Sequence, residues 1–210
     1  NYMSPDRQTS KTGHVEDAIG LTNLRSQTAT ATRPAYTLDG TGIGVAVLDS
    51  GILENHKSFK AQGNQNRIVY SQNFVTTENN TDDEYGHGTH VAGIVAAKNT
   101  RNSGAYQGIA PNANIINLKV LDGEGRGRTS WLLNALDWLV QNHAQYNIRV
   151  VNLSLGTPAV DSYTNNPVNL KVQQLNSLGV LVVAAAGNEG KNSNGQKVYG
   201  YIHSPGNDPS

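Results

Sequence analysis

The stretch IGVAVLDSGI, residues 43–52, indicates the fold more directly than any other part of the chain. Its first six residues are continuously apolar or glycine and rich in β-branched side chains, which is typical of a parallel strand that is covered on both faces. Asp49 follows this run, and Ser50 and Gly51 predict a turn directly after it. We therefore expect Asp49 at the carboxyl end of a buried strand, where the functional groups of α/β proteins gather.

Strand and helix patterns alternate along the rest of the chain. Strands are predicted within RIVYSQNFV (67–75), NIINLKVLDG (114–123), RVVNLSLG (149–156) and VLVVAAAG (180–187). Helices are predicted from about His87, from about Thr129 behind a Thr/Ser cap, and before Gly179, which fits the glycine stop of a helix. A short helix is predicted within 14–27, after an arm of residues 1–14. This alternation predicts an α/β fold with a mainly parallel sheet between helices.

The composition narrows the possible functions. The 210 residues carry sixteen basic and sixteen acidic side chains, so the net charge is zero and no general field attracts nucleic acid or an anionic membrane surface. The chain has no cysteine, which excludes disulfides, thiolate metal sites and thiol catalysis. The longest apolar run, 180–187, is far too short to span a bilayer. A single domain is expected at this length.

His87 is a candidate partner for Asp49. It stands between Gly86 and Gly88, and the apolar residues after it predict a helix that begins near His87. Alone, an Asp at a strand end commonly bonds its own turn, and a His at such a helix start is commonly an exposed or capping residue. Together, a buried Asp49 could fix one nitrogen of the imidazole and leave the other free to take a proton from a hydroxyl group and return it.

Further stretches place this pair in the order of a known family. HGTHVAGIVAA (87–97), NLSLG (152–156) and VVAAAGNEG (182–190) follow one another as in subtilases, which the chain resembles from about His14 to Ser210. The resemblance implies a subtilisin-like three-layer α/β fold and a serine endopeptidase that is secreted to the extracellular space and made as a zymogen. It implies that Asp49 orients the imidazole, that His87 is the general base and acid, and that Asn188 donates to the oxyanion.

The resemblance also implies two segments that hold an extended peptide. Ser154, Leu155 and Gly156 would line the primary specificity pocket, and Gly125 and Gly127 would form the opposite edge, where missing β-carbons let a peptide strand dock. Small side chains at 185–186 would form a pocket wall that admits a large apolar group. Arg126 and Arg128 would flank the groove and favour acidic substrate side chains.

The serine of the triad is absent from this sequence. No GTSMA-like stretch occurs in residues 1–210, and in the subtilisin template the serine lies about 157 positions after the histidine. We therefore expect residues 1–210 to form the N-terminal portion of one catalytic domain, incomplete at the C-terminus, with the Ser beyond Ser210 or on a second chain. Ser154 is the internal candidate, but it maps onto the pocket lining and no GxSxG turn exists.

The chemistry so described needs no cofactor and no catalytic metal. Structural calcium is common in subtilases, and the acidic run 78–84 offers oxygen ligands. However, Ser58 stands where the family often carries a ligand Asp, and the loop KNTRNSGAYQG (98–108) is longer than the usual calcium loop.

Two other functions stay open. A metal-dependent hydrolase would use His87 and His90 with Asp49 or Asp83, although an HxxH pair converges on an ion less well than HExxH, and we expect His90 to pack within the fold. The other alternative is a peptide-binding fragment without catalysis. The expected partners are a polypeptide substrate and a C-terminal fragment of the same enzyme that carries the Ser, with no nucleic acid and no membrane.

Overall fold

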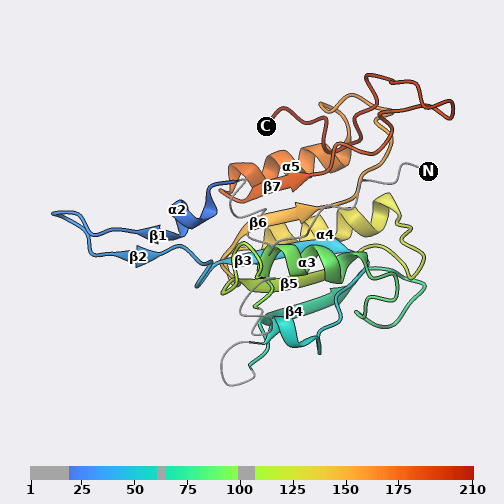
Figure 1. Cartoon of the computed structure of the whole chain (residues 1–210). Coiled ribbons are helices and arrows are strands. Elements are labelled where there is room, and N and C mark those ends of the chain that lie inside the picture. The colour runs from blue at the N-terminus through green and yellow to red at the C-terminus, as the bar shows by residue number, and fades with distance from the viewer. Residues whose placement is uncertain (1–18, 61–64, 99–106) are drawn as a thin grey trace.

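Figure 1 shows the computed structural model of the chain, which describes residues 19–60, 65–98 and 107–210. The predicted arm (1–14) and most of the 98–108 loop lie outside these residues. Of the helix predicted within 14–27, the described part is α2, Leu21–Arg25. It leads into a short antiparallel hairpin of β1 (Ser26–Gln27) and β2 (Tyr36–Thr37), which extends away from the main sheet in Figure 1.

Five strands form the central sheet. They are β3 (Gly44–Asp49), β4 (Ile68–Asn73), β5 (Asn114–Lys119), β6 (Ile148–Leu153) and β7 (Leu181–Ala184). Their order is β4-β5-β3-β6-β7, and every neighbouring pair is parallel. The predicted parallel sheet is therefore confirmed, with β3, the strand of the IGVAVLD run, at its centre.

Helices cover both faces of this sheet. The helices are α3 (His87–Ala96), α4 (Thr129–Asn142) and α5 (Pro167–Ser177), and a 3-10 turn, η1 (Lys57–Phe59), follows β3. Val45 and Val47 of β3 pack in one apolar cluster with the buried alanines of α3, whereas Ala46 and Leu48 pack in a second cluster with α4 and α5. Because alternate side chains of one strand enter opposite clusters, the sheet is the middle of three layers. The predicted three-layer α/β fold is confirmed.

The ends of α4 and α5 show which of the predicted helix caps and stops form. The prediction of a Thr/Ser cap on α4 is wrong, because Arg128 is the extended residue before the helix and its carbonyl already accepts from Trp131 and Leu132, so Thr129 lies inside the helix. In α5, the Asn166 side chain accepts a hydrogen bond of 2.9 Å from the backbone N–H of Val168. Gly179 follows α5 with φ of 78°, so the predicted glycine stop is confirmed.

The strand β7 differs from the other strands, since it lies at the edge of the sheet. Leu181 is 61% exposed and Val183 is 48% exposed, although the apolar run 180–187 predicts a fully buried strand. Within the described residues, moreover, no helix combines the length and the apolar character that crossing a membrane requires.

Candidate active site

Asp49 and His87 meet at the carboxyl edge of the sheet. Asp49 is the last residue of β3 and is 1% exposed, and His87 is the first residue of α3. The His87 Nδ1 atom lies 2.7 Å from Asp49 Oδ1, and the imidazole is 41% exposed. One ring nitrogen is thus bound to a buried carboxylate. The partly exposed ring is positioned to meet a reacting group from outside.

Burial and hydrogen bonding shift the pKa of Asp49 in opposite directions. Burial raises the pKa of the Asp49 carboxyl above its ordinary value, although hydrogen bonds from His87 and Ser50 partly offset this effect. The Ser50 backbone N–H donates to Asp49 Oδ1 over 2.8 Å. Gly88 must be a glycine here, because a β-carbon on it would lie 2.2 Å from the Gly51 carbonyl and 3.1 Å from Asp49 Cβ. The start of α3 can therefore approach the end of β3 closely.

A second carboxylate, that of Asp83, fastens the beginning of α3. Asp83 accepts hydrogen bonds from the backbone N–H groups of Gly86 (2.8 Å) and Thr89 (2.7 Å) and from the Ser50 hydroxyl (2.7 Å). Burial alone would raise the pKa of Asp83, but these hydrogen bonds outweigh it and hold the pKa below its ordinary value. Ser50 also accepts from the Gly88 N–H over 3.0 Å.

Sequence reasoning missed this positioning role, since it considered Asp83 only as a metal ligand. The available signal was an acidic residue just before a predicted helix start, where the unpaired N–H groups and the helix dipole favour a carboxylate.

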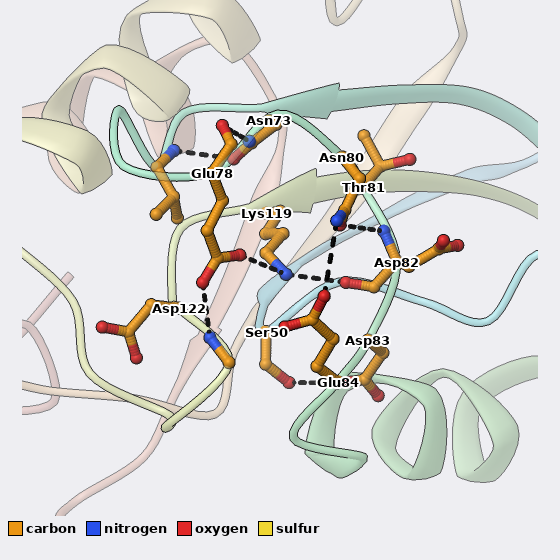
Figure 2. A network of polar contacts seen from close by, with 12 residues as sticks. Ser50, Asn73, Glu78, Asn80, Thr81, Asp82, Asp83, Glu84, Lys119 and Asp122 are labelled. Carbon is orange, nitrogen blue, oxygen red and sulfur yellow. Dashed lines mark hydrogen bonds and ion pairs between the residues drawn. The ribbon is translucent and has the colours of Figure 1, made fainter.

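A buried ion pair fastens the loop that precedes His87, as Figure 2 shows. Lys119 ends β5 beside Asp49 and is fully buried. Its Nζ atom lies 2.9 Å from Glu78 Oε2 and donates to the Asp82 carbonyl over 2.7 Å. The other oxygen of Glu78 accepts from the Gly123 N–H over 2.8 Å. The loop 76–86 is therefore held against the sheet on the side from which α3 begins.

Most of the predicted site residues line one groove. Its volume is about 400 Å³, and its lining includes His87, Gly125, Gly127, Ser154, Leu155, Gly156 and Asn188, together with Tyr85 and Arg128. The two segments expected to hold a peptide therefore line the same cavity as His87 and as Asn188, which lies in the loop after β7. Ala185 and Ala186 are not among its lining residues.

Packing within the chain also requires glycine at two positions of this groove. A β-carbon on Gly125 would lie 2.6 Å from the Tyr85 ring, and one on Gly127 would lie 2.7 Å from Leu121 Cδ2. Gly125 also has φ of 75°, which favours glycine. The missing β-carbons therefore make room for the side chains of this chain as well as for any docked peptide.

The two arginines near the groove differ. The Arg128 guanidinium lies over the Trp131 ring, 5.4 Å from its centroid, and Arg128 lines the groove. Arg126 forms ion pairs with Glu124 (2.7 Å) and Asp122 (3.5 Å). Much of the positive charge of Arg126 is therefore balanced within the same turn, whereas the Arg128 cation stacks on an aromatic ring at the groove.

Among the residues at 19–60, 65–98 and 107–210, no three or more His, Asp or Glu side chains gather as metal ligands. The Glu78 carboxylate already faces Lys119, and the Ser58 carbonyl accepts from the guanidinium of Arg67 over 2.9 Å. The Glu78 carboxylate of the acidic run and the Ser58 carbonyl therefore each have a cationic partner from this chain. His90 is exposed on α3, so its predicted packing role is wrong.

Comparison with known proteins agrees with this geometry. Residues 40–207 match the model of the subtilase family. The chain is 38% identical over 160 residues to subtilisin amylosacchariticus of Bacillus subtilis subsp. amylosacchariticus, which covers 76% of this chain and 38% of that protein. It is 42% identical over 156 residues to subtilisin BL of Lederbergia lenta, covering 74% and 51% respectively. It is 35% identical over 166 residues to serine protease AprX of Bacillus subtilis, covering 77% and 36%.

The fold and the site define an α/β protein with an Asp–His pair at the carboxyl edge of a parallel sheet. The chain belongs to the subtilase family. It spans 38% of the length of subtilisin amylosacchariticus and 51% of that of subtilisin BL.

Proposed function

We propose that this chain is part of a serine endopeptidase that hydrolyses peptide bonds through an Asp–His–Ser triad. The observation that carries the proposal is the contact of 2.7 Å between His87 Nδ1 and the buried Asp49 carboxylate, at a groove that Asn188 also lines. Structural ion pairs also occur in proteins, but this pair lies at an open groove with its ring 41% exposed, which is where functional pairs are found.

The proposed mechanism uses each residue at a stated atom. Asp49 accepts the Nδ1–H of His87 and thereby keeps Nε2 unprotonated in the resting enzyme. Nε2 takes the serine proton as the hydroxyl oxygen attacks the peptide carbonyl, and it then gives this proton to the leaving amine. Asn188 donates its side-chain N–H to the oxyanion of the tetrahedral intermediate. Water repeats the sequence to release the acyl group, so the serine is restored.

The proposed substrate is an extended polypeptide. Gly125, Gly127 and Ser154–Gly156 line the same groove, and a peptide that binds there as an extended strand can form main-chain hydrogen bonds to both segments. Arg128 adds a positive charge at one edge, which supports a preference for acidic side chains away from the cleaved bond.

We place the serine on a segment outside residues 1–210, either a continuation or a C-terminal fragment of the same enzyme. Within the described residues, the groove lining contains one serine, Ser154, whose Oγ accepts from Asn152 Nδ2 over 2.9 Å. The exposed apolar residues of β7 support this arrangement, since a further part of the domain that packs there would cover them.

Family membership further motivates an extracellular location and synthesis as a zymogen. Antibody detection in fractionated cultures is expected to find the mature protein in the medium and a larger precursor in the cells. A mature-sized protein confined to the cells would contradict both parts of this proposal.

Labelling with a fluorophosphonate probe tests the proposed chemistry. The purified enzyme should be labelled on a serine outside residues 1–210, and a chelator should not prevent labelling. His87→Ala should abolish labelling, whereas His90→Ala, an exposed change on the same helix, should not. Sequencing the labelled peptide identifies the segment, and a fragment that starts directly after Ser210 would establish a split chain.

Two outcomes would instead support the alternatives. Peptide cleavage that stops with a chelator and persists without labelling would favour a metal-dependent hydrolase. Peptide binding with neither cleavage nor labelling would favour a fragment that only binds peptides.

A further inference from the structure

The loop after β7 carries Asn188, and hydrogen bonds fasten the two residues with which this loop begins. The Ala185 N–H donates to the Leu153 carbonyl, at the end of β6, over 3.0 Å. The His203 N–H donates to the Ala186 carbonyl, also over 3.0 Å. The position of Asn188 therefore depends on what holds the peptide units that follow Ala186.

A carboxylate holds the peptide unit of Asn188 itself. The Asn188 backbone N–H donates to Glu189 Oε2 over 2.9 Å. The same oxygen lies 2.9 Å from His203 Nε2, and the His203 side chain is 19% exposed. Because one oxygen contacts both groups, the mostly buried imidazole fixes the Glu189 carboxylate, and the carboxylate fixes the Asn188 backbone.

Gly187 shows how closely this pair lies against the loop. A β-carbon on Gly187 would lie 2.8 Å from Glu189 Oε2 and 3.0 Å from His203 Cγ. Gly187 also has φ of 99°, a left-handed conformation that favours glycine. The carboxylate and the ring therefore lie against the backbone of the residue directly before Asn188, in the space that a side chain at 187 would take.

The side chain of Asn188 has no such attachment of its own. Asn188 is exposed and lines the groove together with His87. Within the part of the chain that the structure describes, its side-chain amide forms no hydrogen bond, and its backbone N–H forms the bond to Glu189. The place from which this amide donates is therefore set through the backbone that Glu189 holds.

We propose that Glu189 is a positioning residue for the oxyanion donor Asn188. By fixing the Asn188 backbone, Glu189 holds the side-chain N–H where negative charge develops in the reaction, and His203 keeps the carboxylate in place. Neither Glu189 nor His203 is among the residues that line the groove, so both act through Asn188 and not by contact with the substrate. This inference rests on the proposed peptidase function.

Two general values bound the size of the effect. Loss of one oxyanion donor lowers kcat by about 10²- to 10³-fold. Misplacement of a catalytic group by about 1 Å lowers the rate by about 100-fold. Glu189→Ala displaces the donor without removing it, so we expect kcat to fall by about 10- to 100-fold with KM nearly unchanged.

The test uses the complete enzyme and one tetrapeptide p-nitroanilide. The fluorophosphonate probe titrates the active sites, so kcat refers to correctly folded enzyme. Glu189→Gln keeps an oxygen that can accept from both Asn188 and His203, so it should retain most of the kcat that Glu189→Ala loses. Asp161→Ala, an exposed change in the loop between β6 and α5, is the matched control and should leave kcat unchanged.

A double-mutant cycle separates positioning from a merely structural role. In an enzyme that already carries Asn188→Ala, the donor is absent, so Glu189→Ala should change kcat by less than about twofold. A residue that only stabilised the loop would lower the number of titrated sites and leave kcat per site unchanged.

The outcomes also distinguish this inference from the proposed function. The inference alone is overturned by native kcat in Glu189→Ala, by equal falls of kcat with and without Asn188, or by a fall in Glu189→Gln as large as that in Glu189→Ala. An enzyme that neither reacts with the probe nor cleaves the peptide overturns the proposed function itself.

Discussion

The hydroxyl group of Ser50 lies within hydrogen-bond distance of two carboxylates, those of Asp49 and Asp83. Ser50 Oγ lies 3.2 Å from Asp49 Oδ1 and 2.7 Å from Asp83 Oδ1, and it accepts from the Gly88 N–H. One hydroxyl has one proton, so it donates fully to one carboxylate at a time. The shorter distance assigns the proton to Asp83. Asp49 then relies on His87 and the Ser50 N–H for its hydrogen bonds.

The first prediction concerns the pair at the centre of the site. Asp49→Asn should lower kcat by about 10⁴-fold, because an amide favours the wrong tautomer of His87. Asn188→Ala should lower kcat by about 10²- to 10³-fold with little change in KM, because its donor acts on the oxyanion. Steady-state kinetics on one peptide substrate check both. A fall of less than tenfold in either variant would contradict the role assigned to that residue.

The second prediction concerns Asp83 as a positioning residue. Asp83→Asn replaces one acceptor oxygen with an amide nitrogen and so breaks a bond to either Thr89 or Gly86 and Ser50. A small displacement of His87 should follow and lower kcat by up to about 100-fold with KM nearly unchanged. The matched control is Asp82→Asn, because Asp82 contacts Lys119 through its backbone carbonyl.

A merely structural role for Asp83 would give a different result. Lower stability without displacement of His87 would reduce the amount of active enzyme, as titrated with the fluorophosphonate probe, and leave kcat per active site equal to that of the native enzyme.

At the scale of elements, the loop 76–86 depends on β5. Lys119 is the last residue of β5, and its cationic side chain is fully buried. It contacts the loop at the Glu78 carboxylate and at the Asp82 carbonyl. Asn117 of the same strand donates to the Thr81 carbonyl over 3.1 Å. Two side chains of one strand therefore hold a loop that shares few apolar contacts with the core.

The third prediction tests this attachment. Lys119→Met removes the cation and leaves the Glu78 carboxylate without its partner, so the free energy of unfolding should fall by about 3 kcal/mol. Urea denaturation of the inhibited enzyme measures it, with the exposed Lys57→Met, expected within about 0.5 kcal/mol, as control. The double variant with Glu78→Leu should recover much of the loss, because an apolar pair needs no charge partner. If Lys119→Met and the double variant lowered the free energy of unfolding equally, this account would be contradicted.

The fourth prediction follows from the pKa of Glu78. The hydrogen bond from Lys119, aided by the Gly123 N–H, lowers the pKa of Glu78 below its ordinary value of 4.5. The folded state thus favours the ionised carboxylate, and this contribution to stability is complete above pH 4.5 and is lost as the pH falls through the lower folded value.

Glu78→Gln should accordingly be less stable than the native protein at pH 7, and the difference should shrink as the pH is lowered toward 3. Urea denaturation at several pH values measures this. Glu124→Gln, whose side chain is 70% exposed, is the control and should show little difference at any pH. A difference that grows on acidification would contradict the assignment.

The elements also show what sequence can predict. The central strand β3 was predictable because it is a continuous apolar run, and the glycine stop at Gly179 because its φ of 78° is a left-handed conformation that favours glycine. The cap of α4 and the packing of His90 were not, since both depend on how the helix is oriented against its neighbours. The role of Lys119 was not predictable either, because its partners Glu78 and Asp82 come from a distant part of the sequence that only the fold brings beside β5.

At the scale of the whole molecule, the two segments expected to hold a peptide line one groove. Parallel strands end at one edge of the sheet, so residues after β3, β5, β6 and β7 had to gather there. The order of strands within the sheet is less accessible to sequence reasoning, because apolar runs carry no record of which strand is the neighbour of which.

The fifth prediction concerns metal removal from the whole enzyme. Because Lys119 already binds the Glu78 carboxylate and Arg67 already binds the Ser58 carbonyl, we expect EDTA to leave both the peptidase rate and the melting temperature unchanged within error. Thermal unfolding followed by circular dichroism, with and without the chelator, checks this. A fall in melting temperature that added calcium reverses would show a calcium site elsewhere in the enzyme.

The open edge of β7 has a consequence for handling the protein. A strand that ends a sheet and exposes Leu181 and Val183 offers a template on which another chain can add a strand. Residues 1–210 produced alone should therefore self-associate in proportion to concentration, and slow light-scattering growth in storage would reveal it. Coexpression with the proposed serine-bearing segment, which we expect to cover β7, is the direct way to avoid such aggregates.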